Sequence, residues 1–296
     1  MKFYPNLFIG FSFRRFLSYY IYTKFQTFKY YLKHILPNKK FLKNTLKLKN
    51  SKKGKKVFIF GSGKSMNLLD PKKVLGFVND KGYEVIGLNS FLYSDFAKNI
   101  KPNFMVFSDP IDFKGVSEKD IRKYREIAGK EDKKKATDKN IPLIIPIQFL
   151  KYSSPDKEQV FYFNDSSDYF LENIDLLKPR PFKSFTGMKA IAAGIYMGYD
   201  EIYICGFDYD YFKKTTVNKD NQITFEFTHF YESKERPNDI LPIKKYSFGY
   251  HLYDCALAFI QHDKFRNFNI VNLHKDSFID SFPKNKILNV YLDSES

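Results

Sequence analysis

Short apolar runs alternate with longer amphipathic segments through most of this chain of 296 residues. Short runs rich in Val, Ile, Phe and Tyr are typical of buried strands, and the longer segments between them are typical of helices. Such alternation predicts a mainly parallel sheet with helices on both faces. The expected strands are residues 57–60, 83–88, 104–107, 142–147, 201–206 and 268–273, and the expected helices cover 70–79 and 91–100, begin at 186 and lie within 247–263.

Two stretches depart from this alternation. Residues 116–139 are highly charged, which predicts a solvated helix and loop, and residues 157–185 have no clean periodicity. A loop-rich stretch before a resumed strand-helix pattern is where a lid over a ligand site would lie. The expected fold class is therefore α/β, with a single Rossmann-like nucleotide-binding domain and a lid segment.

The first expected strand ends in Gly-Ser-Gly-Lys-Ser at residues 61–65. Glycines let the backbone approach a ligand closely and a helix start is electropositive, so such a turn can hold a phosphate or a sugar hydroxyl. It is neither of two common nucleotide loops, because a Walker loop needs glycine at Phe58 and a dinucleotide fingerprint needs glycine at Met66. An ordinary strand-to-helix turn is the alternative interpretation.

Small polar residues also follow the next two expected strands. Asn89 follows the second strand, and Asp109 follows the third, one residue after Ser108. The carboxyl ends of neighbouring parallel strands meet at one crevice. We therefore predict that Ser62, Asn89 and Asp109, together with Thr186 at the start of a later helix, meet around one nucleotide.

The formal net charge of +16 is concentrated near the N-terminus. Residues 1–56 contain 15 Lys or Arg and no Asp or Glu, so residues 57–296 contain 49 − 15 = 34 basic and 33 acidic residues, a balance of +1. A body this close to neutral is not a basic platform for nucleic acid, and no nucleic-acid partner is expected.

The acid-free stretch defines the expected domain boundary, with a leader at residues 1–55 and a catalytic domain at 56–296. The leader is aromatic and basic, and from Lys39 to Lys56 it reads as a polar linker. None of its uninterrupted apolar runs approaches the ~18–20 residues that a transmembrane helix needs. Its composition suits a helix lying on an anionic membrane surface. A packing helix with a flexible tail is the alternative.

The two cysteines, Cys205 and Cys255, do not make a disulfide framework and suggest a reducing compartment. There is no cluster with zinc-ligand spacing and no signal peptide with a small-residue cleavage site. The expected location is cytoplasmic, peripheral on the inner face of the cytoplasmic membrane.

A longer block of motifs runs from Thr186 to Asp208, TGMKAIAAGIYMGYDEIYICGFD. A histidine-bearing segment comes before the last helix, and D-S-F-I-D-S-F follows the last strand at 276–282. Together with G-x-G-x-S at 61–65 and Asn89, this series resembles the bacterial lipooligosaccharide sialyltransferases, glycosyltransferase family 42. The resemblance covers roughly residues 56–285.

The resemblance implies a single nucleotide-binding domain with a lid that transfers sialic acid, or a related acidic sugar, from a CMP-activated donor. Transfer would be inverting and metal-independent, with no cofactor and with a lipooligosaccharide or capsule glycan as acceptor. Ser62 and Asp109 stand where the family has asparagine. The expected nucleotide-binding residues are Gly61, Ser62, Gly63, Ser65, Asn89, Asp109, Thr186, Gly187 and Lys183, the last at the place of a lid arginine.

The chemistry requires a base for the proton of the acceptor hydroxyl and groups that stabilise the departing phosphate. Histidine suits the first role because its pKa lies at about 6.5. His251 or His229 is the expected base, and an ungapped match to the family places Phe248 at its catalytic histidine, three residues before His251. Tyr209 and Tyr211 are expected to hold the leaving phosphate.

The sequence also allows other interpretations. Asp208-x-Asp210 resembles the D-x-D that holds a divalent ion in many nucleotide-sugar transferases, although this spacing is frequent by chance. A rival enzyme class is the motility-accessory or pterin pyrophosphokinase-like group, whose members share a glycine turn and a Gly-x-Asp strand end. A rival outside enzymes is a membrane-associated binding module that uses the basic leader.

Overall fold

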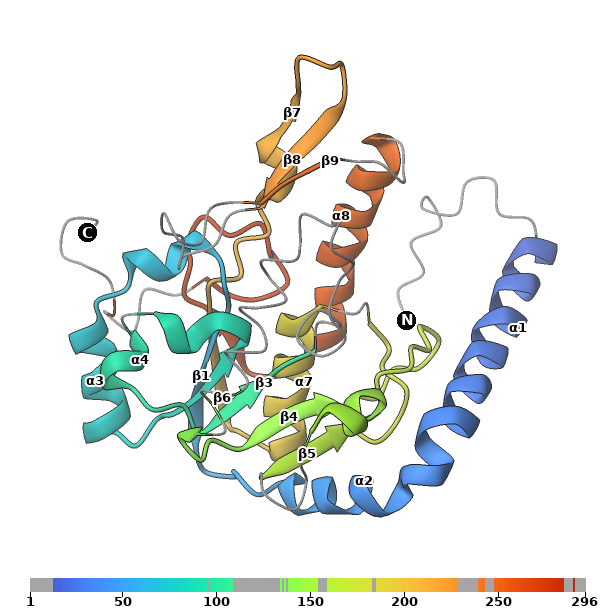
Figure 1. Ribbon diagram of the computed structural model, residues 1–296. Coiled ribbons are helices and arrows are strands. Elements are labelled where there is room, and N and C mark those ends of the chain that lie inside the picture. The colour runs from blue at the N-terminus through green and yellow to red at the C-terminus, as the bar shows by residue number, and fades with distance from the viewer. Residues whose placement is uncertain are drawn as a thin grey trace.

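A seven-stranded parallel sheet forms the centre of the computed structural model, in the order β10-β6-β1-β2-β3-β4-β5 (Figure 1). The structure describes residues 13–94, 96–108, 134, 136, 138–153, 159–182, 185–227, 239–242, 248–284 and 290. The strands are β1 (Lys56–Phe60), β2 (Glu84–Leu88), β3 (Phe104–Val106), β4 (Leu143–Pro146), β5 (Val160–Phe163), β6 (Glu201–Cys205) and β10 (Ile270–Asn272).

The strand order reverses beside β1. From β1 the chain builds outward through β2 to β5, and it then returns through a helix to β6 on the other side of β1. In open α/β sheets, ligands bind outside the carboxyl ends of the strands at such a reversal. The loops that follow β1 and β6 are therefore the place where a ligand site is expected.

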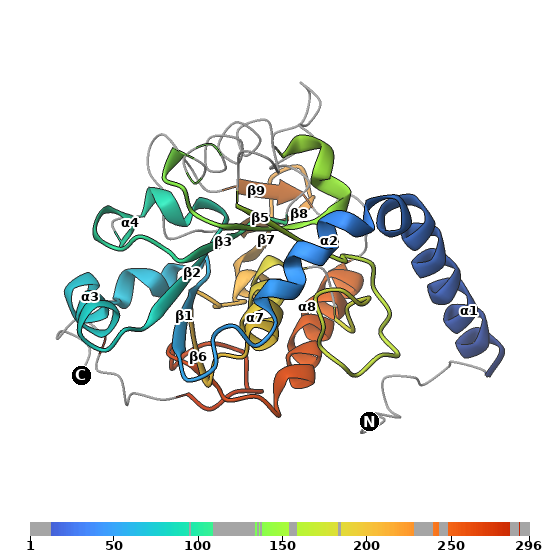
Figure 2. The same cartoon turned by 90° about the horizontal axis from the view of Figure 1, so that it is seen from below.

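Helices lie on both faces of the sheet, with α7 on one face and α4 on the other (Figure 2). Their ends follow local chemistry: the Asp70 side chain accepts the Lys72 N–H at 2.8 Å at the start of α3, and Gly198, with φ +80°, ends α7. The helices are α1 (Phe13–Tyr30), α2 (Lys39–Thr45), α3 (Pro71–Asp80), α4 (Phe96–Asn99), α7 (Thr186–Met197) and α8 (Phe248–His262).

Alternate residues of each strand supply two separate layers of core. Phe58 and Phe60 of β1 pack on the face that carries α3 and α4, whereas Val57 and Ile59 pack on the face that carries α7. Small residues let α7 lie close to the sheet. A side chain at Gly194 would place its Cβ 3.1 Å from Ile202 Cδ1.

The predicted α/β class, with a parallel, Rossmann-like sheet flanked by helices, is confirmed, and each of the six predicted strands is present. A seventh strand, β5, lies inside the stretch that had no clean periodicity, and a small antiparallel sheet was not predicted. The small sheet consists of β7 (Thr215–Val217), β8 (Ile223–Phe227) and β9 (Asp239–Pro242). The short helical turns are η2 (Tyr31–Ile35), η3 (Leu36–Asn38), η4 (Leu46–Leu48), η5 (Lys64–Leu68), η6 (Asn89–Tyr93), η7 (Ile147–Tyr152), η8 (Tyr211–Lys214) and η9 (Asp263–Phe265).

The stretch expected to be a polar linker is packed against the body instead. Leu42 and Leu48 are buried in the core on either face of the sheet, and Thr45 Oγ1 donates to the carbonyl oxygen of Tyr162 at 2.7 Å. Helix α2 therefore covers the outer edge of β5. Lysines on the solvated side give this segment the composition of a linker, while its few apolar residues fix its position. Among the described helices, none is both long enough and apolar enough to cross a membrane.

Candidate nucleotide site

The turn after β1 lies directly against the turn after β6. Gly61 N–H donates to the Cys205 carbonyl oxygen at 2.7 Å, and Gly63 N–H donates to that of Gly206 at 2.9 Å. A Cβ at Gly61 would lie 2.3 Å from the Gly206 carbonyl oxygen, and Gly206 itself has φ +75°. These glycines are required by the contact between the two turns.

The Asp208 carboxylate fills the turn at residues 61–65. It accepts the Ser65 N–H at 3.0 Å and also the Ser65 hydroxyl, and both residues are buried. A Cβ at Gly63 would lie 2.5 Å from Asp208 Cγ, so this glycine makes room for the carboxylate. The protein's own anion therefore occupies the place where the glycine turn was expected to hold a phosphate. The N–H groups of Gly61, Gly63 and Ser65 all donate within the protein.

The side chain of Ser62, in the same turn, could contact a ligand. Its side chain is partly exposed, and within the part of the chain that the structure describes it has no hydrogen-bond partner. A free hydroxyl at the carboxyl end of β1 can donate to a ligand oxygen or accept from a ligand hydroxyl.

Asn89 lies at the carboxyl end of β2 in the left-handed region, with φ +44°. Its side-chain Oδ1 is buried and accepts no hydrogen bond from the described residues. A buried acceptor without a donor is costly, and each such group in a native structure calls for an explanation. A ligand hydroxyl or amino group would satisfy it.

The third strand end is tied to the start of α7. Ser108 follows β3, and its Oγ lies 2.8 Å from Thr186 Oγ1 at the first residue of α7. Gly187 packs on the turn after β6, because a Cβ there would lie 2.5 Å from Phe207 Cε1. The described members of the predicted group, Ser62, Asn89 and Thr186, therefore lie at the same edge of the sheet. Asp109 and Lys183 lie outside the described residues.

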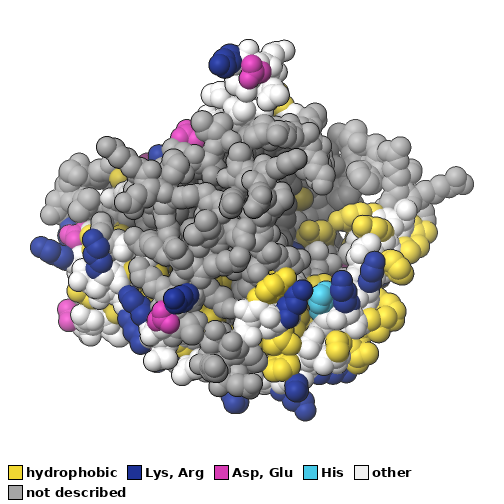
Figure 3. Space-filling model, in the orientation of Figure 1, with side chains coloured by type: hydrophobic (Ala, Val, Ile, Leu, Met, Phe, Trp, Pro, Cys, Tyr) yellow, Lys and Arg dark blue, Asp and Glu magenta, His cyan; other side chains and the backbone are white. Residues whose placement is uncertain are grey.

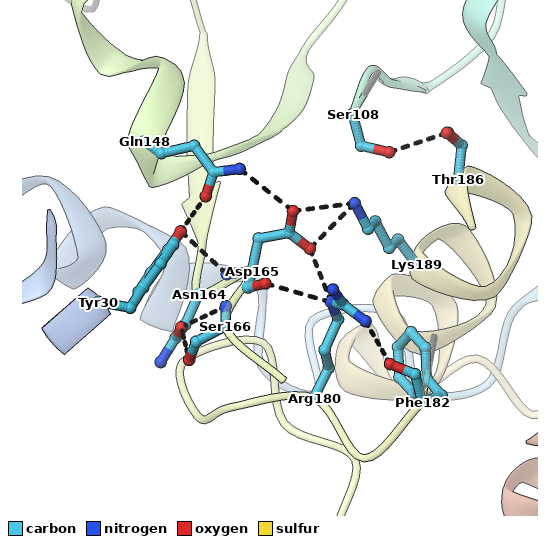
Figure 4. Close-up of polar contacts among 10 residues, drawn as sticks. All are labelled: Tyr30, Ser108, Gln148, Asn164, Asp165, Ser166, Arg180, Phe182, Thr186 and Lys189. Carbon is cyan, nitrogen blue, oxygen red and sulfur yellow. Dashed lines mark hydrogen bonds and ion pairs between the residues drawn. The ribbon is translucent and has the colours of Figure 1, made fainter. Parts of the chain in front are cut away.

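A polar network that sequence reasoning missed borders this edge (Figure 4). The Asp165 carboxylate, in the loop after β5, forms ion pairs with Lys189 Nζ at 2.9 Å and with Arg180 Nε at 2.8 Å. All three side chains are buried, and together they carry one net positive charge. Lys189 lies one turn after Thr186 on α7, so this positive charge adds to the helix start. No local sequence signal links these residues, which are 24 positions apart at the extremes.

Helix α1 closes the same network from outside. The Tyr30 hydroxyl, at the end of α1, donates to Gln148 Oε1 and accepts the Asp165 N–H at 3.3 Å. Gln148 in turn donates to the Asp165 carboxylate at 3.3 Å. The leader thus contributes a side chain to the surroundings of the candidate site.

Tyr209 lies at the start of the loop after Asp208 with φ +52°. Its ring packs against Phe185, Phe259 and His262, with centroid distances of 5.8, 6.2 and 5.0 Å. Although the residue as a whole is partly exposed, burial around its hydroxyl raises its pKa, so the group is a neutral donor at neutral pH. Tyr211 lies in η8, and its side chain is outside the described part of the chain.

The structure gives only limited information on the two histidines predicted as the base. His251 is the fourth residue of α8 with its side chain outside the described part, and His229 lies outside the described residues altogether. A third histidine, His262, is fully buried at the end of α8. Its Nδ1 lies 2.8 Å from the Ala258 carbonyl oxygen, and burial lowers its pKa to about 4. Its Nε2 is buried without a partner among the described residues.

The two aspartates of the D-x-D pattern have different partners. Asp208 is bonded to Ser65, whereas Asp210 forms an ion pair with Lys214 at 2.7 Å. Nowhere in the described ranges do three or more His, Cys, Asp or Glu residues gather as they would around a metal ion.

The sequence matches no protein-family model and no curated protein. Two solved structures are similar in fold. The MAf glycosyltransferase from Magnetospirillum magneticum AMB-1 is 13% identical with a TM-score of 0.48, and the match covers 88% of this chain and 40% of that longer chain. The sialyltransferase CstII from Campylobacter jejuni, solved in complex with a substrate analogue, cytidine-5′-monophosphate, is 16% identical with a TM-score of 0.40, and the match covers 81% of this chain and 88% of that chain. Neither likeness assigns an activity to this chain.

Proposed function

We propose that this protein is a glycosyltransferase that transfers sialic acid, or a related acidic sugar, from a CMP-activated donor to a surface glycan with inversion. The observation that carries the proposal is the grouping of Ser62, Asn89 and the Ser108–Thr186 pair at one edge of a parallel sheet, beside the strand reversal. The motif series from Thr186 to Asp208 supports a CMP-sugar over other nucleotides.

The hydrogen-bonding chemistry of each group indicates which part of the nucleotide it would bind. The buried Asn89 Oδ1 is an acceptor, so it suits a ribose hydroxyl or a base amino group and not a phosphate. The phosphate belongs nearer the start of α7, because the first N–H groups of a helix have no partner within the helix and the Asp165–Arg180–Lys189 group carries net positive charge. Ser62 hydrogen-bonds to the sugar or phosphate from the opposite turn. Asp109, outside the described residues, would suit ribose hydroxyls.

In the proposed reaction the acceptor hydroxyl attacks the anomeric carbon while the bond from that carbon to the CMP phosphate breaks. His251 or His229 takes the hydroxyl proton, and CMP leaves with the electron pair of the broken bond. Tyr209 and Tyr211 donate hydrogen bonds to the departing phosphate, with Lys183 adding charge. If neither His251→Ala nor His229→Ala slows transfer, the general-base assignment is wrong.

Binding of the nucleotide is tested by thermal unfolding with CMP, UMP and GMP. A ligand that binds only the folded state raises stability by RT ln(1 + [L]/Kd), about 2.7 kcal/mol at a hundred times Kd, and CMP should give the largest shift. Asn89→Gly should abolish the shift while keeping the left-handed backbone. Asn140→Gly is the matched control, because Asn140 also has a positive φ, of 51°, and is exposed.

Turnover separates the proposal from its rivals. Release of CMP from CMP-sialic acid supports the transferase. Release of AMP from ATP would instead indicate the pyrophosphokinase-like class, and nucleotide binding with no turnover on either substrate would indicate a binding module. Activity that disappears with EDTA would promote a metal role for Asp208 and Asp210.

We also infer that the protein works at the inner face of the cytoplasmic membrane, held by residues 1–56. The support is the charge of this stretch, with 15 basic and no acidic residues. A lipid-linked or surface glycan acceptor would be reached from that position.

A further inference from the structure

Helix α1 has two distinct faces, and the inner one is fixed to the body. Thr27 Oγ1 donates to the Ser167 carbonyl oxygen at 3.1 Å, and Lys24 forms an ion pair with Asp168. Thr23 on the same face is only 6% exposed. Three aromatic rings of α1 surround the ring of Phe170, namely those of Phe16, Tyr19 and Tyr20.

The outer face carries an apolar stripe that nothing covers in the described structure. At 100° per residue, its positions within α1 fall on the side of the helix away from Thr23 and Thr27. The side chains are between 44% and 60% exposed, whereas Thr23 on the inner face is 6% exposed. We call this set the outer stripe: Leu17, Ile21, Phe25 and Phe28 of α1, with Leu32 of the following turn η2.

Cations of the same acid-free segment flank the outer stripe. Lys29 and Lys33 are exposed and form no ion pair with any described residue, and residues 1–56 contain no Asp or Glu. Figure 3 shows hydrophobic and basic side chains side by side along the edge of the molecule that α1 forms. Apolar side chains bordered by unpaired lysines are complementary to a surface with negative headgroups above an apolar layer.

We propose that the outer stripe docks on an anionic lipid bilayer, with Phe25 and Phe28 entering the headgroup boundary. Lys29 of α1 and Lys33 of η2 contact lipid phosphates. The proposal rests on the membrane association inferred above and assigns the surface that makes it. A second copy of this chain fits less well, because a two-fold contact would bring two acid-free, basic faces together.

Docking through α1 also places the candidate site relative to the membrane. The inner face of α1 holds the loop at residues 164–170, which follows β5 at the edge of the sheet where Asn89 and Thr186 lie. A bilayer on the outer stripe is therefore separated from that edge by one helix and one loop, which suits an acceptor that stays attached to the membrane.

Co-sedimentation of the full chain with phosphatidylcholine vesicles, with and without phosphatidylglycerol, tests this surface. We expect binding only to the anionic vesicles. Phe25→Ser and the double variant Lys29→Glu/Lys33→Glu should each weaken it about tenfold or more. The matched controls remove the same groups elsewhere: Phe268→Ser, and Lys101→Glu with Lys219→Glu, should bind like the wild type.

Wild-type vesicle binding by Phe25→Ser would overturn the proposal, as would equal loss in the controls. A change of molar mass in solution for Phe25→Ser, with vesicle binding intact, would show that the stripe is a contact between copies. The CMP-induced thermal shift of the same variants should equal that of the wild type. If CMP gives no thermal shift in the wild type, the proposed CMP-activated donor is wrong. The vesicle-binding result does not depend on that outcome.

Discussion

At the scale of single residues, the Asp208 carboxylate and the turn after β1 hold each other in place. Ser65 donates to the carboxylate through both its N–H and its hydroxyl, and the missing side chain at Gly63 leaves the space for it. Hydrogen bonds to a carboxylate are stronger than those between neutral groups, and this carboxylate accepts two of them from one residue. The geometry of the crevice at the strand reversal depends on this contact.

Gly63→Ala should therefore destabilise the fold by about 1–3 kcal/mol, because its Cβ would lie 2.5 Å from Asp208 Cγ. Gly76→Ala is the control. In α3 its Cβ would meet only Asp80 Oδ2 at 3.7 Å, and alanine in a helix should stabilise by about 0.5–1 kcal/mol. Urea unfolding of both variants measures the difference, and equal changes in the two would contradict this account of Gly63.

His262 is the residue whose protonation should affect stability most clearly. Burial lowers its pKa to about 4, whereas the unfolded chain binds the same proton with a pKa of about 6.5. The unfolded state therefore gains protons first as the pH falls. The stability linked to this group is complete above pH about 6.5 and is lost progressively down to pH about 4.

His262→Phe should remove this part of the pH dependence. The ring would stay among Tyr209 and Phe282 without a titrating group. Between pH about 6.5 and 4 the wild type should lose on the order of 1–3 kcal/mol more than the variant. Denaturant unfolding at a series of pH values measures this, and parallel curves for the two proteins would show that His262 does not titrate in this way.

At the scale of elements, the Asp165 network joins parts of the chain that share no sequence pattern. It connects the end of α1 through Tyr30, the turn η7 through Gln148, the loop after β5 and the helix α7 through Lys189. One carboxylate balances two buried cations. Removing it would take from the buried Lys189 and Arg180 side chains the carboxylate that both contact.

Asp165→Asn should consequently lower the free energy of unfolding by about 3–5 kcal/mol, the cost of breaking a buried pair from one side. Arg266→Ala is the contrast, because the Arg266–Asp263 pair is exposed and should be worth less than about 1 kcal/mol. Thermal unfolding of the two variants gives the comparison. A loss in Asp165→Asn no larger than in Arg266→Ala would mean that the network contributes little to stability.

The sheet was predictable from the sequence because its strands are continuous apolar runs buried on both faces. The polar residues expected at the strand ends, Ser62, Asn89 and Asp109, followed from the same pattern. The structure describes the first two at that edge of the sheet, and Asp109 lies outside the described residues. The occupant of the glycine turn did not follow, because Asp208 is 143 positions from Ser65 and only the pairing of β1 with β6 brings them together. Likewise β5 was missed, since its apolar run is short and is followed by a polar segment that is buried in the structure.

At the scale of the whole molecule, residues 31–55 belong to the folded body. Ile35 and Leu42 lie in the core on one face of the sheet and Leu48 lies in the core on the other. Lys52 and Lys55 also pair with Glu84, the first residue of β2. Helix α1, in contrast, contacts the body along one face.

A chain that begins at residue 56 should therefore be much less stable than one that begins at residue 31. Loss of the buried Ile35, Leu42 and Leu48 side chains should cost more than about 5 kcal/mol in total, enough to prevent folding of many domains. The longer chain loses α1 and its Tyr30 contact but keeps this core. Circular dichroism during heating distinguishes the two, and equal unfolding temperatures would show that residues 31–55 are dispensable.

By itself, the sequence determined the α/β class, the six apolar strands, the concentration of positive charge before Lys56 and the polar residues at the strand ends. Each of these features follows from local composition or periodicity, which depends only on residues close together in the sequence. Only the tertiary structure decided that Asp208 fills the glycine turn, that Asp165 balances Arg180 and Lys189, and that α1 exposes one apolar stripe while its other face is held by the body. These are contacts between residues far apart in the chain, and burial of a charge or a side chain is set by what the fold places beside it.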